Sequence, residues 1–211
     1  MKPLNKNFSQ RFYLKSVYVI FSLISAFFIT SCSNNDDDAP VTEPTPIVYP
    51  QENPLDKYYE STGFTTTTYF VASPTSEFGL AFSPNVKGKI NAIFVKIPAV
   101  KSNLRVTIWD YDTKAVMRTE VVNVTTANNV ITKNISEILL EKDKKYMITM
   151  NSGDWYKRAK PDNSNATYPI TAGNIKFWEY RWVGTASQIF PTNIDLKYNG
   201  GDLSFSFQQT D

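Results

Sequence analysis

The chain of 211 residues contains no histidine and only one cysteine. Without histidine, Ser-His-Asp and Cys-His catalysis, histidine-bound zinc and imidazole general bases are all excluded. One cysteine cannot form a disulfide within the chain or a cysteine-based metal cluster. Chemistry would therefore depend on carboxylates, lysine, tyrosine or a hard metal ion, and we expect a protein that is not an enzyme and carries no cofactor.

The first 31 residues contain no acidic side chain but four basic ones, at Lys2, Lys6, Arg11 and Lys15. A mostly apolar run follows from Val17 to Ile29. As a helix this run would measure roughly 20 Å, which is short of the ~30 Å hydrocarbon core of a membrane. A basic start, a short apolar stretch and small residues before a cut site are typical of an export signal, so residues 1–31 are predicted to be a signal peptide.

The residues Ile29-Thr30-Ser31-Cys32 resemble the lipobox of bacterial lipoproteins. The resemblance implies cleavage before Cys32 and lipid attachment to its thiol and its new amino group, which would join the protein to a membrane. The alternative is a secreted protein with a chance cysteine. With residues 1–31 removed, 18 basic residues (22 − 4) face 20 acidic ones. No basic excess remains for a nucleic-acid partner.

Residues 32–56 are predicted to form a disordered tether, because they hold five of the twelve prolines and six acidic residues. Such a composition favours extended polyproline II geometry and cannot form a core. The acidic cluster Asp36-Asp37-Asp38 resembles the surface-export signal of lipoproteins in the Bacteroidetes group. That resemblance implies a lipid-anchored protein of the outer membrane, exposed at the cell surface. An ordinary acidic linker is the alternative.

Residues 57–211 are predicted to form a single domain of β-strands with polar turns between them. The alternation of apolar and polar residues indicates an all-β fold, an antiparallel β-sandwich of the jelly-roll or Greek-key type with roughly seven to nine strands. Asn134–Lys142 is the one stretch with a short helical pattern. In the last strand we expect Phe205 and Phe207 to point inward and Ser204 and Ser206 outward. The expected strands are Ile90–Pro98, Leu104–Asp110, Ala115–Val124, Ile138–Leu140, Tyr146–Met150, Ile175–Val183 and Leu203–Phe207.

Part of this domain resembles an uncharacterised family of bacterial extracellular β-sandwich domains. The resemblance rests on four stretches within roughly residues 64–152, namely Phe78–Phe82, Gly88–Ile93, Leu104–Asp110 and Tyr146–Thr149. It implies a jelly-roll-like sandwich with an accessory or recognition role, and it carries over no catalytic residue.

The segment 154–183 holds three of the four tryptophans and several tyrosines beside charged residues. Strand alternation predicts Trp178, Tyr180 and Trp182 on one face and Phe177, Glu179 and Arg181 on the other. Flat rings beside polar groups suit a sugar, because its C–H face packs on aromatic rings while rim side chains bind hydroxyls. A core face or a protein-binding patch are the alternatives. The candidate ligand-binding residues are Asp154, Trp155, Tyr156, Trp178, Tyr180, Arg181 and Trp182.

Three other groups of residues have weaker functional interpretations. Asp110 and Asp112 offer oxygen ligands for calcium, although turn formation explains them better. Trp109 is expected to pack on a sheet face, and the groups Lys144-Lys145 and Lys157-Arg158-Lys160 to be solvated surface charge.

The leading hypothesis is a cell-surface lipoprotein that recognises a glycan or a partner protein without catalysis. One alternative is a carboxylate-based glycoside hydrolase using Glu179 and Asp154, since such enzymes need two acids ~5–9.5 Å apart. The other is a structural subunit of an adhesin or appendage.

Overall fold

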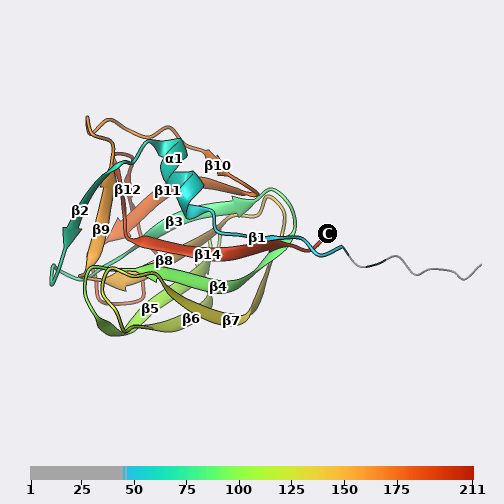
Figure 1. The fold of residues 1–211 in the computed structure, drawn as a ribbon, viewed down its shortest axis with the longest axis horizontal. Helices are drawn as coiled ribbons and strands as arrows, with labels where there is room; N and C mark the ends of the chain where they lie inside the picture. Colours follow the sequence, from blue (N-terminus) through green and yellow to red (C-terminus); the bar gives the residue numbers. More distant parts are fainter. Residues whose placement is uncertain (1–44, 46) are drawn as a thin grey trace, which may run out of the picture. The chain divides into compact units, whose positions relative to one another are not determined.

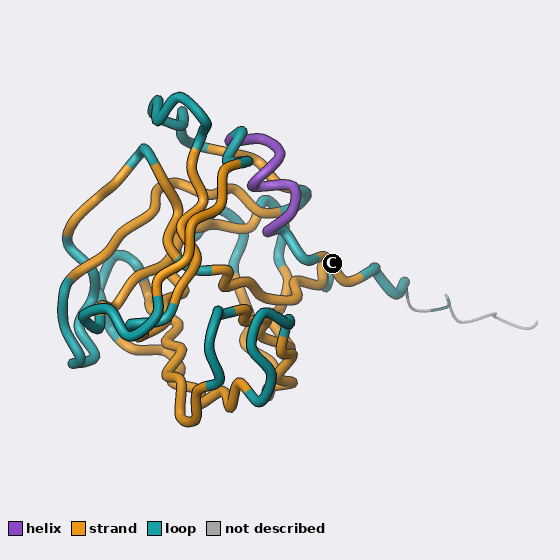
Figure 2. The backbone as a smooth tube through the Cα atoms, turned by 60° about the vertical axis from the view of Figure 1, so that its left-hand side comes forward, coloured by secondary structure: helices purple, strands orange, loops and turns teal. Residues whose placement is uncertain are grey.

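The computed structural model describes residue 45 and residues 47–211 (Figure 1). The predicted signal peptide, the lipid anchor at Cys32, the acidic cluster and most of the tether lie outside these residues. The prediction of an all-β, antiparallel sandwich is confirmed, because almost every regular element is a strand (Figure 2). Within the described part of the chain, no helix is long and apolar enough to cross a membrane.

The strands of the described residues form three sheets. The four-stranded sheet has the order β1 (Gln51–Glu52), β14 (Asp202–Gln209), β4 (Gly88–Lys96) and β7 (Ile131–Leu140). The large sheet has the order β10 (Ile170–Ala172), β11 (Ile175–Val183), β3 (Ser76–Pro84), β8 (Tyr146–Ser152), β5 (Lys101–Asp110) and β6 (Val116–Val124), with β12 (Asn193–Asp195) also paired to β11. The small sheet has the order β13 (Tyr198–Gly200), β9 (Trp155–Ala159) and β2 (Thr66–Phe70). All the predicted strands are present. The nine-residue β3 and six shorter strands add to them, so the described residues contain fourteen strands rather than the seven to nine expected.

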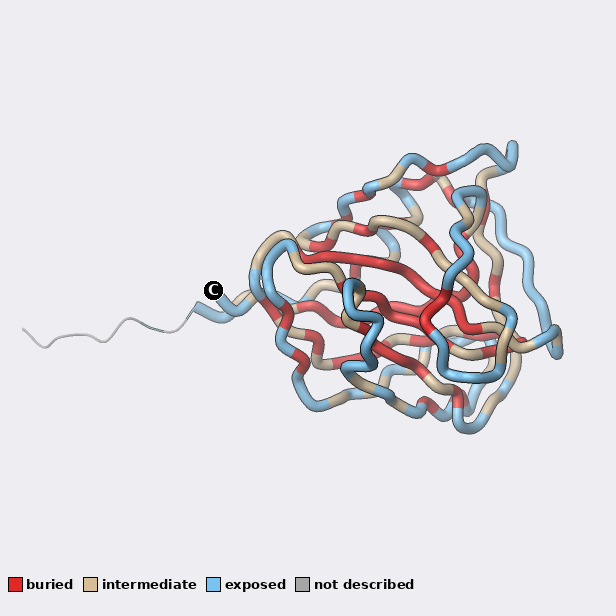
Figure 3. Tube along the Cα trace, turned by 180° about the vertical axis from the view of Figure 1, so that it is seen from behind, coloured by how far each residue is buried: buried red, intermediate tan, exposed pale blue. Residues whose placement is uncertain are grey.

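The core lies between the four-stranded sheet and the large sheet, where buried positions run along the inner strands (Figure 3). Phe82 of β3 and Phe205 of β14 come from the two different sheets, and their ring centres are 4.6 Å apart. Ile93 of β4 and Ile108 of β5 are also fully buried. These contacts close the sandwich.

Residues 51–56 belong to the fold, contrary to the predicted tether boundary at residue 56. β1 pairs with β14, and Glu52 accepts hydrogen bonds from the backbone and side chain of Asn174. The helix α1 (Leu55–Thr62) follows directly and buries Tyr58 completely. Acidic and proline-rich composition alone could not reveal these specific partners.

This N-terminal segment also explains why both faces of β14 are buried. Ser204 and Ser206 were expected outside, yet they are only 3% and 2% exposed. The Ser204 hydroxyl donates to Asn53 Oδ1 at 2.6 Å, and the Ser206 hydroxyl donates to Gln51 Oε1 at 3.1 Å. Buried hydroxyls need such partners.

Two helical features differ from the sequence prediction. Asn134–Lys142 is not a helical turn, because it falls mainly in β7, paired with β4. The unexpected α1 starts after Pro54 and ends at Gly63, whose φ of 72° suits a glycine at a helix end.

Gly79 provides a test of the contact between β3 and β8. A Cβ atom at this position would overlap the backbone carbonyl of Ile148, which cannot rotate away. We predict that Gly79→Ala lowers the free energy of unfolding by about 3 kcal/mol, the upper end of overpacking costs. Urea denaturation measures this. The control Gly184→Ala has no atom within 4 Å of the added methyl and should change stability little. Equal stability of the two variants would contradict the described strand pairing.

Candidate functional site

A β-bulge in β11 decides which aromatic side chains reach the interior. The register between β11 and β3 shifts between Phe177 and Glu179, so Trp178 is the extra residue. Phe177 and Tyr180 are consequently both buried in the core, with Trp182 packed against it. The predicted shared face of Trp178, Tyr180 and Trp182 is therefore wrong, because strict alternation ends at a bulge.

Trp178 lies on the outer face of the large sheet. Its indole N–H donates to Ser83 Oγ at 3.0 Å, and Lys145 Nζ lies 4.0 Å from the ring centre. Arg181 and Glu179 form an ion pair at 2.5 Å, and both contact the hydroxyl of Tyr111. Trp178 and Arg181 are thus separated from the buried face of β11.

Alternation along β9 separates the two aromatic residues that the sequence placed in one site. Trp155 stacks on Phe70 of β2 with ring centres 4.4 Å apart, and Tyr198 of β13 lies on the same face. Tyr156 points to the opposite face, where its hydroxyl donates to Asn128. One face of the small sheet therefore carries the rings, and the other carries Tyr156 and Arg158.

Trp155, Tyr180 and Trp182 meet in a pocket of about 230 Å³ between the small sheet and the inner face of the large sheet. We call this the aromatic pocket. Its complete lining is Ser76, Phe78, Trp155, Tyr180, Trp182 and Tyr198. Three of the seven candidate residues from the sequence therefore lie together here, whereas Asp154, Tyr156, Trp178 and Arg181 do not line this pocket.

Two phenol hydroxyls supply polar groups in the aromatic pocket. Among the described residues, the hydroxyls of Tyr180 and Tyr198 form no hydrogen bond, and neither belongs to the fully enclosed polar atoms that lack a partner, whereas the Trp155 N–H donates to Ser73 Oγ at 3.2 Å. Burial raises the pKa of Tyr198 to about 12 and that of Tyr180 well above its usual value. Both hydroxyls are therefore protonated at neutral pH and can donate as well as accept.

Asp154 has a structural role beside this pocket rather than a place in its lining. Its carboxylate accepts a hydrogen bond from the Ala72 backbone at 2.7 Å and lies 3.8 Å from Lys101 Nζ. It shares no partner with Glu179, which bonds Tyr111 and Arg181. The two acids proposed as a hydrolytic pair thus belong to different clusters of contacts.

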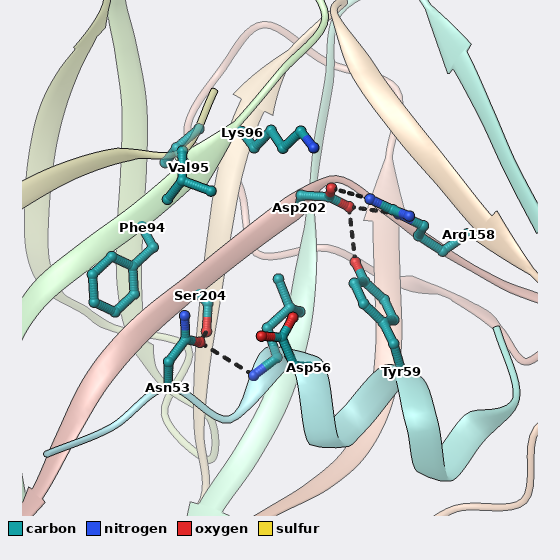
Figure 4. Close-up of a pocket in the computed structure, with 11 residues that line it drawn as sticks. Asn53, Asp56, Tyr59, Phe94, Val95, Lys96, Arg158, Asp202 and Ser204 are labelled. Carbon is teal, nitrogen blue, oxygen red and sulfur yellow. Dashed lines mark hydrogen bonds and ion pairs between the residues drawn. The ribbon is translucent and has the colours of Figure 1, made fainter. Parts of the chain in front are cut away.

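Arg158 is not the solvated charge that the sequence suggested. Its guanidinium binds Asp202 through two hydrogen bonds, Nε to Oδ1 at 3.0 Å and Nη2 to Oδ2 at 2.5 Å. Tyr59 donates to the same carboxylate at 3.0 Å. These residues line a second pocket (Figure 4). It lies on the opposite face of β9 from the aromatic pocket, because Trp155 and Arg158 alternate along this strand. We call it the Asp202 pocket.

Sequence reasoning missed Phe78, Ser76 and Tyr198 in the aromatic pocket. Phe78 was interpreted only as part of a core strand, and Tyr198 lies outside the aromatic segment 154–183. The available signal for Tyr198 was its position just before Asn199-Gly200-Gly201, which the sequence suggests as a turn. In the structure Asn199 and Gly200 belong to β13 and pair with β9. Gly200 also has a packing reason, because a Cβ there would overlap the hydroxyl of Tyr180.

Trp109 packs on a sheet face as predicted. It is 3% exposed, its N–H donates to Thr149 Oγ1 at 2.8 Å, and its ring meets Phe190 edge-on. Residues 45 and 47–211 contain no group of three or more acidic, histidine or cysteine side chains arranged to hold a metal ion.

Comparison with other proteins gives no functional assignment. No known family model matches the chain, and no curated protein matches it either. The function must therefore be argued from the pockets and the sequence.

Asp110 behaves as a turn residue with a measurable pH dependence. Its carboxylate accepts hydrogen bonds from the Thr113 backbone and hydroxyl and forms an ion pair with Lys144 at 3.0 Å. The pKa of Asp110 is lowered from 3.8 to about 2, mainly by the hydrogen bond from the Thr113 backbone N–H and next by Lys144.

A lowered pKa in the folded state means that Asp110 stabilises the fold at neutral pH and loses this effect as the pH falls from 3.8 to about 2. We predict that Asp110→Asn lowers stability at pH 7, and that the difference from the unmodified protein disappears near pH 2. Urea denaturation at several pH values measures both. A difference that is independent of pH would contradict the role of the charged carboxylate.

Proposed function

We propose that the protein is a lipid-anchored lipoprotein of the outer membrane whose β-sandwich, displayed at the cell surface, binds a glycan in the aromatic pocket. The observation that carries the proposal is the meeting of Trp155, Trp182 and Tyr198 from separate strands in one concave site. The resemblances to an export signal and to a lipobox support the proposed location, and the aromatic pocket supports the proposed class of ligand.

The aromatic pocket suits a sugar because it combines ring faces with hydroxyl groups. The C–H face of a pyranose packs on aromatic rings, as apolar surfaces do generally. The hydroxyls of Tyr180 and Tyr198 can each donate to or accept from a sugar hydroxyl. A concave site also favours a small unit of a glycan over a flat protein surface. Recognition of a partner protein remains the alternative at the exposed strand β2.

We prefer recognition to hydrolysis because Glu179 and Asp154 have different partners and neither lines the aromatic pocket. A glycoside hydrolase needs two carboxyl groups on either side of one bond. An adhesin subunit would use the same anchor, and a glycan ligand is compatible with that role.

The anchor is tested at Cys32, which lies outside the described residues and is the only cysteine. We predict that Cys32→Ala abolishes incorporation of labelled palmitate and releases the protein from the membrane fraction, because no other thiol can take the lipid. Cys32→Ser is the matched variant and should behave identically. Palmitate labelling of either variant would contradict the lipoprotein assignment.

The ligand site is tested by comparing Trp182 with Trp178 on the same strand. We predict that Trp182→Ala weakens binding on a glycan array. The loss in binding free energy should be on the order of 1 kcal/mol for each aromatic contact removed. Trp178→Ala should leave binding unchanged, because this ring lies on the opposite face of the large sheet with Ser83 and Lys145.

Trp182 packs partly on the core, so its loss also lowers stability. Tyr198→Phe separates the two effects, because it removes only a hydroxyl without a partner in the described structure. We expect weaker binding at unchanged melting temperature. Normal glycan binding by both Trp182→Ala and Tyr198→Phe, or no glycan bound by the unmodified domain, would contradict the proposal.

A further inference from the structure

The Asp202 pocket is a second cavity of about 230 Å³, separated from the aromatic pocket by the small sheet. It lies where the start of α1 meets β14, β4 and β9 (Figure 4). It shares no lining residue with the aromatic pocket. Its lining is Asn53, Leu55, Asp56, Tyr59, Phe94, Val95, Lys96, Val130, Arg158, Asp202 and Ser204.

One wall of this pocket is held rigidly by a buried hydrogen-bond network. The Asp202 carboxylate, which is 6% exposed, accepts two hydrogen bonds from Arg158 and one from Tyr59. Tyr59 in turn accepts from Asn199 Nδ2 at 2.9 Å, and Arg158 donates to Thr67 at 2.7 Å. A bidentate pair with these further partners fixes the position of each group before any ligand arrives.

Other polar groups of the Asp202 pocket keep capacity for a ligand. Asp56 and Lys96 form no ion pair with any residue that the structure describes. Asn53 uses Oδ1 for the Leu55 backbone and for Ser204, which leaves its two Nδ2 hydrogens for a ligand. The pocket thus offers a carboxylate acceptor, an ammonium donor and an amide donor.

The charges of this lining favour an uncharged ligand. Asp56 and Asp202 balance Lys96 and Arg158, so the formal charge of the lining is zero (2 − 2). A ligand that meets both donors and acceptors needs groups that do both, and hydroxyls have this property. The side chains of Leu55, Phe94 and Val130, none of which is buried, add apolar surface for C–H groups.

We infer that the Asp202 pocket is a second glycan site, which binds the hydroxyl-bearing edge of a neutral pyranose through Asn53, Asp56 and Lys96. The ligand class rests on the proposed function, whereas the site is independent of the aromatic pocket. Because Trp155 and Arg158 project from opposite faces of β9, one sugar unit cannot occupy both pockets. The domain would therefore bind a polysaccharide at two points, which raises its avidity for long chains over short ones.

The experiment is a titration of the ¹⁵N-labelled domain with neutral methyl glycosides, followed by amide chemical shifts. Methyl glucoside, galactoside and mannoside are the probes, with glucuronate and glycine as charged comparisons. We expect at least one neutral glycoside to shift amides around Asp56, Lys96 and Ser204. These shifts are distinct from those around Phe78 and Tyr198, which report the aromatic pocket.

Variants assign the effect to the named groups. Lys96→Met and Asp56→Asn should each raise the dissociation constant measured from the first set of shifts about fivefold. This is the effect of one lost hydrogen bond worth about 1 kcal/mol. Trp182→Ala should leave this set unchanged, and Lys142→Met, at an exposed position outside the pocket, is the matched lysine control.

Each outcome separates the two proposals. Shifts around Lys96 that persist in Trp182→Ala support the second site whatever the aromatic pocket does. Shifts confined to Phe78 and Tyr198 overturn the second site and leave the proposed function intact. Shifts around Lys96 with glucuronate or glycine alone overturn the neutral-sugar assignment. Full binding by both Lys96→Met and Asp56→Asn would also overturn it.

Discussion

The bulge at Trp178 is the constraint on which the aromatic pocket depends. Without it, Tyr180 and Trp182 would share the face of Trp178, outside the sandwich, and Phe177 would face the core together with the charged residues Glu179 and Arg181. The extra residue reverses the alternation within a single strand, so that both halves of β11 contribute rings to the interior. Bulges are used in this way to redirect side chains next to binding sites.

The small sheet lies between the aromatic pocket and the Asp202 pocket. Its strand β9 sends Trp155 toward the large sheet and Arg158 toward α1 and β14, so one five-residue strand borders two cavities of different character. The aromatic pocket contains ring faces and no charged side chain, whereas the Asp202 pocket contains two acids and two bases. The N-terminal segment completes the second pocket by placing Asn53 and Asp56 against β14.

Local patterns in the sequence were sufficient to predict the fold class, because apolar residues alternate along β4 and β5 and their buried positions line the core. The same patterns placed Trp155, Tyr180 and Trp182 in one candidate site, together with four residues that do not line the aromatic pocket. They failed where the structure depends on long-range partners. Three features depend on residues that are distant in sequence: the register shift at Trp178, the covering of Ser204 by Asn53 and the pairing of Arg158 with Asp202. The periodicity of apolar residues cannot predict such contacts.

Sugar binding between the small sheet and the large sheet is the feature on which the proposed function depends. A crystal structure of the domain soaked with an oligosaccharide chosen from an array screen shows whether sugar binds there. We expect a sugar ring in the aromatic pocket against Trp182 or Trp155, with a hydroxyl bound to Tyr198. A sugar stacked instead on Trp178 beside Lys145, with the aromatic pocket empty, would contradict it.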